Sequence, residues 1–223
     1  MKYLLITILF IFTFKLSYSQ ITPEDKFGAW YTLDVNHKIF NKISIKTGIQ
    51  LRSFEVFDNI NLLFYYTGFD YQLNKNTKLT LVYCYLDIDR SFLISGENHL
   101  YENRPYEQIT YKCKLFKLPV YQRFRLEHRF LNFKNNHSLL NRFRYQLGAK
   151  ININKTFFLN INNEVFANLK GEVFNENRFY TAIGMNISKN NSIQLGYLNH
   201  EINNQNLNRL QVGLYFKTDL RKN

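Results

Sequence analysis

The chain has 223 residues, a formal net charge of +12 and a mean hydropathy of −0.33. Aromatic residues make up 17% of it, which excludes a disordered chain because such chains are depleted in aromatics. Two cysteines are too few for a scaffold built on disulfides. The basic residues are scattered singly rather than clustered on a helix or tail, which argues against a nucleic-acid-binding protein.

The first residues, 1–19, have the pattern of a secretory signal peptide. Lys2 supplies the positive start, and an apolar run of about ten residues follows it. Ser17 and Ser19 are the small residues at the −3 and −1 positions, which predicts cleavage between Ser19 and Gln20. The run is too short to span a bilayer as a helix, and no cysteine follows the cut to carry a lipid anchor. We therefore expect an exported chain.

Residues 20–223 are expected to form one domain, with a net charge of 27 − 17 = +10 once the two lysines of the signal are removed. Its pattern is alternation: in residues 42–53 the apolar side chains share one parity and the polar side chains share the other. The same pattern predicts eleven strands, over residues 27–38, 42–53, 60–73, 79–86, 106–115, 120–131, 139–150, 157–167, 178–187, 192–200 and 209–217. Many reach the length of about nine to eleven residues that a tilted membrane-spanning strand needs.

The predicted connections alternate in length. Four are short turns, at residues 74–77, 116–119, 152–155 and 188–191, and four are longer, at residues 87–104, 132–138, 168–177 and 201–208. Short periplasmic turns and longer outer loops are typical of an outer-membrane barrel. We therefore expect an all-β, antiparallel, up-and-down transmembrane β-barrel of about 10–12 strands in the outer membrane of a Gram-negative cell. Such barrels usually have an even number of strands, so we expect ten or twelve, with twelve preferred.

A soluble β-sandwich or lipocalin-like barrel is the alternative, because its strands alternate in the same way. Strand length, loop asymmetry and the heavily polar second face favour the membrane barrel. In a membrane barrel the alternation assigns the two cysteines to opposite faces, with Cys84 toward the lumen and Cys113 toward lipid. Opposite faces do not bring two Cβ atoms within about 4.5 Å, so we expect no disulfide.

The densest set of charged residues lies on one parity of the middle strands. A charge at the lipid midplane costs about 2–4 kcal/mol, so this set must point into the lumen. Its members are Arg123, Arg125, Glu127, Arg129, Arg142, Arg144, Glu164 and Arg178.

Two interpretations of this set remain open. A packed salt-bridge network could plug a narrow barrel, which would then serve a structural or surface-interaction role. Alternatively, the arginines could line a small anion-preferring pore or a cavity that binds phosphate or carboxylate, whose geometry a guanidinium group matches. Six arginines exceed two glutamates, so the remaining charge must meet other carboxylates such as Asp34 or Asp70, water, or a bound anion.

Catalytic patterns are missing from the sequence. His137 and Ser138 are neighbours, but neighbours on a strand point to opposite faces and cannot act as base and nucleophile. No Gly-rich phosphate loop and no spaced set of metal ligands occurs, so we expect no cofactor and no metal. An outer-membrane lipid-modifying enzyme is the least favoured interpretation. The expected partners are outer-membrane lipid, small anions and the barrel-assembly machinery, which would read the alternating apolar end of the chain up to Phe216.

Several short motifs resemble those of a known family. They are Arg123-Phe124-Arg125-Leu126-Glu127-His128-Arg129, Glu164, Asn177-Arg178-Phe179-Tyr180 with Gly184, Trp30, and Gln194-Leu195-Gly196-Tyr197. With them the chain is similar, over roughly residues 27–217, to family 2490 of the domains of unknown function (DUF2490), outer-membrane barrels of Bacteroidetes. The resemblance implies the fold and the location, and it implies no activity.

Overall fold

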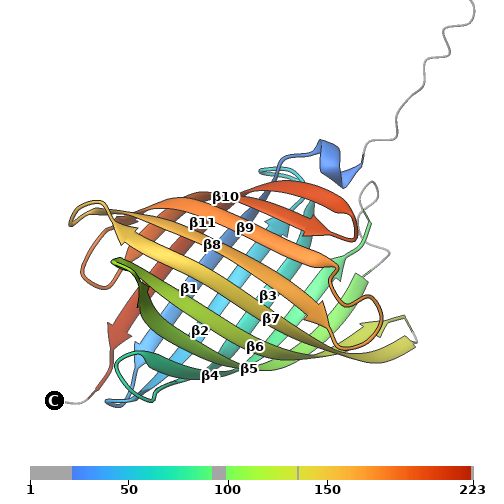
Figure 1. The fold of residues 1–223 in the computed structure, drawn as a ribbon. Helices are drawn as coiled ribbons and strands as arrows, with labels where there is room; N and C mark the ends of the chain where they lie inside the picture. The colour runs from blue at the N-terminus through green and yellow to red at the C-terminus, as the bar shows by residue number, and fades with distance from the viewer. Residues whose placement is uncertain (1–21, 92–98, 135, 222–223) are drawn as a thin grey trace, which may run out of the picture.

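The computed structural model describes residues 22–91, 99–134 and 136–221. They form a closed barrel of eleven strands preceded by one turn of 3-10 helix, η1 (Pro23–Asp25) (Figure 1). The strands are β1 (Gly28–Lys38), β2 (Ile43–Ser53), β3 (Ile60–Gln72), β4 (Thr77–Asp89), β5 (His99–Leu115), β6 (Leu118–Phe133), β7 (Asn136–Asn152), β8 (Phe157–Asn168), β9 (Glu176–Asn186), β10 (Ser192–Ile202) and β11 (Gln205–Asp219). Among the described residues, no helix is long and apolar enough to span a membrane.

The barrel closes with an odd number of strands, so the expectation of ten or twelve was wrong. Every neighbouring pair is antiparallel except the closing pair, in which β1 runs parallel to β11 from Gly28 opposite Arg209 to Lys38 opposite Asp219. In an up-and-down sheet with an odd number of strands, the first and last strands run in the same direction. They can therefore pair only through a parallel ladder, which needs no hairpin between them. Closure therefore does not require a twelfth strand.

The predicted difference between short turns and long loops is only partly present. The strands continue into the expected loops, and β6–β7 and β10–β11 are joined by very short turns. At Asn203 and Asn204 the backbone has φ values of 48° and 62°, which two-residue hairpin turns of the primed type require and asparagine tolerates. At the end of the barrel that carries these two short connections, the longer connections among the described residues are residues 54–59 and 169–175.

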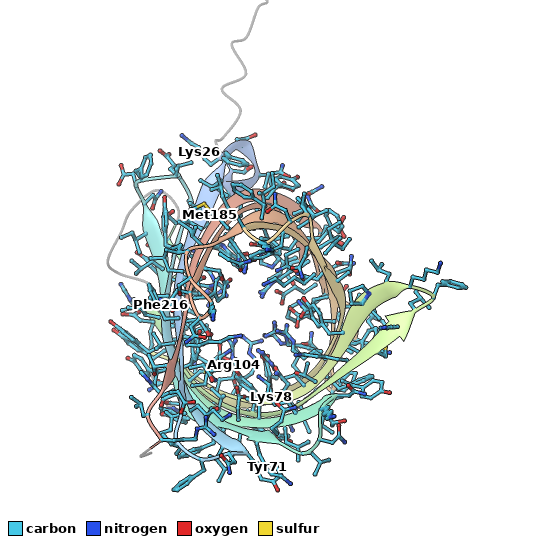
Figure 2. All side chains as sticks on the ribbon, turned by 90° about the vertical axis from the view of Figure 1, so that its left-hand side faces the viewer. Lys26, Tyr71, Lys78, Arg104, Met185 and Phe216 are labelled. Atoms are coloured by element: carbon cyan, nitrogen blue, oxygen red, sulfur yellow. The ribbon has the colours of Figure 1, made fainter. Side chains whose placement is uncertain are left out.

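The two faces of the barrel have opposite chemistry. Figure 2 looks along the barrel and shows Arg104 and Lys78 inside, with Tyr71 and Phe216 on the outside. The exposed large apolar side chains follow the outward parity, for example Phe69, Leu81 and Ile183. The buried set contains many charged residues. A soluble barrel would place the apolar set inside, because the burial of apolar surface stabilises it, so the fold is that of a transmembrane β-barrel.

Interior glycines let large aromatic rings lie flat against the wall. A Cβ built on Gly184 would stand 2.1 Å from the ring of Phe158, which faces it on β8, and one on Gly48 would stand 2.2 Å from the hydroxyl of Tyr66 on β3. Real Cβ atoms do not approach so closely, so only glycine allows these rings their positions. Cross-strand pairs of this kind help to set the register of a sheet.

The odd number of strands puts the start of β1 and the end of β11 at opposite ends of the barrel. Near the start, the Asn206 backbone N–H donates to Glu24 and Arg209 donates to the carbonyl oxygen of Lys26 at 2.9 Å. At the far end, the Leu220 backbone N–H donates to the carbonyl oxygen of Lys38 at 2.8 Å.

We therefore expect the two ends of the barrel, the start of β1 and the end of β11, to lie on opposite sides of the membrane. Epitope tags placed after Gln20 and after Asn223 in separate variants should differ in their digestion by protease added to intact cells: one tag is cleaved and the other is protected until the cells are permeabilised. Equal accessibility of both tags on intact cells would contradict the eleven-stranded topology.

Candidate functional site

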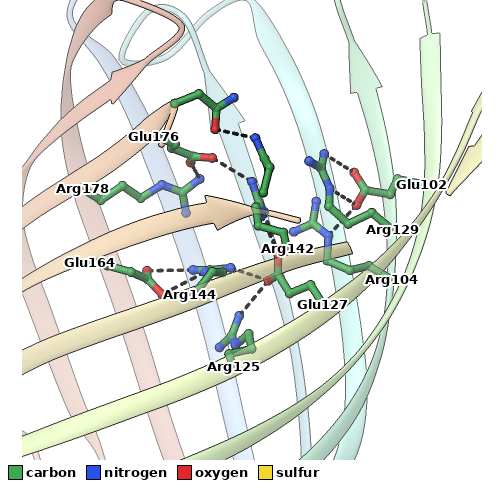
Figure 3. Close-up of polar contacts among 12 residues, drawn as sticks. Glu102, Arg104, Arg125, Glu127, Arg129, Arg142, Arg144, Glu164, Glu176 and Arg178 are labelled. Carbon is green, nitrogen blue, oxygen red and sulfur yellow. Dashed lines mark hydrogen bonds and ion pairs between the residues drawn. The ribbon is translucent and has the colours of Figure 1, made fainter. Parts of the chain in front are cut away.

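An ion-paired cluster occupies the interior wall formed by β5 to β9 (Figure 3). We call it the arginine network. It consists of Glu102, Arg104, Arg123, Arg125, Glu127, Arg129, Arg142, Arg144, Glu164, Glu176 and Arg178. All eight charged residues expected to line the lumen are among its members.

Glu127 is the centre of the network, and its side chain is fully buried. Arg142, directly opposite on β7, donates from Nε and Nη2 to Oε2 of Glu127 at 2.9 and 2.7 Å. Oε1 accepts from Arg144 at 2.5 Å and from Arg125 at 3.4 Å. Arg125 and Arg144 face each other in the register, where two like charges would repel. The shared carboxylate oxygen between them offsets that repulsion.

Glu164 extends the network onto β8. Arg144 donates to its two carboxylate oxygens at 2.9 and 2.7 Å, which is the bidentate geometry that guanidinium favours. Arg123 donates to Oε1 of Glu164 at 2.6 Å. The buried ring of Phe166, two residues along the strand, has the guanidinium carbons of Arg142 and Arg144 at 4.8 and 4.4 Å from its centroid. These are cation–π distances.

The set of eight charged residues chosen from the sequence offers its six arginines two glutamates as partners, Glu127 and Glu164. Arg129 and Arg178 pair with neither Glu127 nor Glu164. Arg129 donates to both oxygens of Glu102 at 2.7 and 3.0 Å, and Arg178 pairs with Glu176.

Glu102, Arg104 and Glu176 lie in segments that the alternation predicts as loops, residues 87–104 and 168–177, so the sequence did not reveal them as members of the network. Pro105 interrupts the pairing in this part of β5. The proline has no N–H to donate, and the ladder between β5 and β6 skips Arg104 and Pro105 before it resumes at Tyr106.

Asp34 and Asp70, which were one of three possible sources of neutralisation beside water and a bound anion, form ion pairs with lysines and not with arginines. Asp34 pairs with Lys46 at 2.9 Å and accepts from Tyr66. Asp70 pairs with Lys78 at 2.8 Å and accepts from Thr80. These carboxylates line a cavity of about 400 Å³ toward the end where β11 terminates, together with Lys38, Lys42, Lys46, Lys78, Lys112 and Lys217. We call it the lysine cavity.

A second cavity, of about 350 Å³, lies next to the arginine network and is called here the arginine cavity. Its charged lining consists of six arginines and one carboxylate: Arg52, Arg104, Arg123, Arg125, Arg144, Arg178 and Glu164. Trp30 on β1 forms part of the wall, and the guanidinium carbon of Arg52 lies 3.7 Å from the centroid of its ring. With Arg52 included, eight guanidinium groups face four carboxylates in this part of the barrel, those of Glu102, Glu127, Glu164 and Glu176. The interior is therefore strongly positive.

Several of the described histidines have polar partners, and His37 has Nδ1 2.6 Å from the exposed hydroxyl of Thr218. His128 lies on the outer face, with Nδ1 2.9 Å from Asn141 and Nε2 3.3 Å from Glu107, and neither partner supplies a hydroxyl or thiol nucleophile. His200 is buried against Glu176 at 2.9 Å. No group of three metal-ligating side chains occurs in the part of the chain that the structure describes. Cys84 is buried, Cys113 is partly exposed, and both are free.

The fold and this interior define a transmembrane β-barrel with a basic, ion-paired lumen. The profile of a family described as "Protein of unknown function (DUF2490)" matches residues 27–211, and the chain belongs to that family. No curated protein and no solved structure matches the chain.

Glu127 provides a test of the network. We expect Glu127→Gln to lower the free energy of unfolding by about 3–5 kcal/mol, because three buried guanidinium groups lose a shared counter-charge. Unfolding can be followed in detergent by the loss of the heat-modifiable gel band. The control is Glu55→Gln, whose carboxylate is 41% exposed and pairs with Lys26 outside the strands. An exposed pair contributes about 0–1 kcal/mol, so equal losses in the two variants would contradict a stabilising role for Glu127.

Proposed function

We propose that the protein is an outer-membrane barrel whose lumen admits small anions. The observation that carries the proposal is the charge of the lumen lining: six arginines and one carboxylate in the arginine cavity, and six lysines and two carboxylates in the lysine cavity. A cavity of one charge sign with low-dielectric walls focuses the electric field and concentrates ions of the opposite sign. The export signal and the apolar outer face support the outer membrane as the location.

The two cavities suggest two roles along the barrel, the collection of anions in the lysine cavity and their recognition in the arginine cavity. Lys78 and Lys46 are paired with aspartates, whereas no carboxylate of the described residues lies within ion-pair distance of Lys112 or Lys217. Lysine is a strongly hydrated, flexible point charge, which suits the collection of hydrated anions at a mouth. Arginine presents a rigid fork of donors, which suits their recognition deeper in the lumen.

A structural barrel with a closed lumen is the second candidate, and the buried network around Glu127 favours it. Barrels of about eight strands are filled by side chains, whereas those of sixteen leave an aqueous channel. Eleven strands lie between these limits, so the strand number does not decide between the two functions. Ion conduction does distinguish the two functions, because a plugged barrel conducts no ions.

We expect the purified protein in a planar bilayer to conduct, and its reversal potential in a salt gradient to favour chloride over potassium. Lys112→Glu should shift that potential toward the cation, because it reverses an unpaired charge in the lysine cavity. The matched control is Lys189→Glu, at an exposed position in the turn between β9 and β10. Absence of conductance would favour the closed structural barrel. An equal shift in both variants would contradict a role for the lysine cavity in the ion selectivity.

A further inference from the structure

Four buried polar side-chain atoms have no hydrogen-bond partner among the described residues: Nε of Arg123, Nε of Arg178, Oδ1 of Asn160 and the hydroxyl of Tyr180. All four belong to residues that line the arginine cavity. A buried polar group without a partner costs about 1–3 kcal/mol, so such groups are rare and need an explanation, such as a bound water, ion or ligand. Their collection in one cavity indicates a place where a polar ligand completes the site.

The two guanidinium groups are held in position by their other nitrogens. Arg123 donates from Nη2 to Glu164 at 2.6 Å, which leaves its Nε–H free. Arg178 pairs through Nη2 with Glu176, and its guanidinium carbon lies 4.9 Å from the ring centroid of Trp30. Donors fixed in this way lose little entropy when they bind an anion, which favours affinity.

Asn160 and Tyr180 add a different requirement. Nδ2 of Asn160 donates to Gln194 at 3.0 Å, and its Oδ1 is left as an acceptor without a donor. Tyr180 is packed with Trp30, Ala182 and Leu198, and its hydroxyl can donate or accept. A ligand that satisfies the whole set therefore carries anionic oxygens and at least one hydrogen-bond donor.

We propose that the arginine cavity is a binding site for hydrogenphosphate or for the singly protonated form of a phosphate monoester. Such a ligand offers oxygens to the two Nε–H groups and a P–OH group to the oxygen of Asn160. Sulfate has the same shape and charge as hydrogenphosphate but no proton at neutral pH, so it leaves that oxygen without a partner. The proposal rests on the proposed function only in that the lysine cavity supplies the anion.

Trp30 makes the site observable, because it is the single tryptophan of the chain and lies in the cavity wall. Titration of the purified, folded barrel with inorganic phosphate should change its tryptophan fluorescence in a saturable way. Sulfate at equal ionic strength should bind at least about tenfold more weakly, since it lacks one hydrogen bond to a buried acceptor. Glycerol phosphate distinguishes the source: a monoester site saturates with it below pH 6, near its second pKa, whereas a site for free phosphate excludes it.

Tyr180→Phe is the variant that tests the binding site most specifically. It removes a buried hydroxyl that has no protein partner among the described residues, so it should not lower the stability of the barrel. We expect it to weaken phosphate binding about tenfold through the loss of one hydrogen bond to a charged ligand. Tyr145→Phe is the control, because Tyr145 lies on the outer face, where its hydroxyl donates to Gln122 at 3.3 Å. Arg123→Lys, which keeps the charge and removes the Nε–H donor, should also weaken binding.

The possible outcomes separate this site from the proposed function. Saturable phosphate binding in a barrel that shows no anion selectivity would sustain the site and overturn the conduction proposal. Anion selectivity with a linear, unsaturable phosphate response would sustain conduction and overturn the site. Equal affinities for phosphate and sulfate, or equal effects of Tyr180→Phe and Tyr145→Phe, would also overturn the site.

Discussion

Guanidinium groups on membrane-spanning strands must point into the barrel and away from lipid, and the rest of the structure depends on that constraint. Turning Arg142 or Arg144 toward lipid would cost about 2–4 kcal/mol each, while a domain is stable by only about 5–15 kcal/mol. The strands that carry the arginines must therefore present the other parity, with residues such as Phe124 and Phe143, to lipid. Once these strands are oriented, hydrogen bonding to their neighbours fixes which residues of the remaining strands face inward.

Inward arginines need counter-charges, and their number determines the character of the lumen. Burial of paired charges brings little net stability, because the desolvation penalty offsets most of the attraction. The four carboxylates of the arginine network prevent isolated buried charges but do not neutralise the arginines. The surplus positive charge of the arginine cavity, on Arg52 in particular, whose Nε donates to Gln50 rather than to a carboxylate, is what distinguishes this interior from a packed salt-bridge core. It connects the fold to the proposed anion function.

Local alternation predicted the strands and their faces, because the period of two is a direct consequence of the pleat. The partners of Arg129 and Arg178 could not be predicted in this way. They depend on how far β5 and β9 extend and on the stagger between strands, and neither is encoded in a single strand. β5 begins at His99, well before the predicted residue 106, and a tight turn at Asn203 and Asn204 lies within the predicted loop of residues 201–208. The parallel closure of β1 and β11 was missed for the same reason, since pairing between the ends of the chain leaves no local pattern.

The central claim is that the apolar parity of the strands contacts lipid and the polar parity does not. Quenching of tryptophan by brominated lipid measures this contact along β4, in a background in which Trp30 is replaced by phenylalanine. Tryptophan at Leu81 or at Tyr83, which are 61% and 50% exposed on the outer face, should be quenched. Tryptophan at Val82, which is 2% exposed and faces the interior, should not be quenched. Equal quenching at the three positions, or quenching at Val82 alone, would contradict the account.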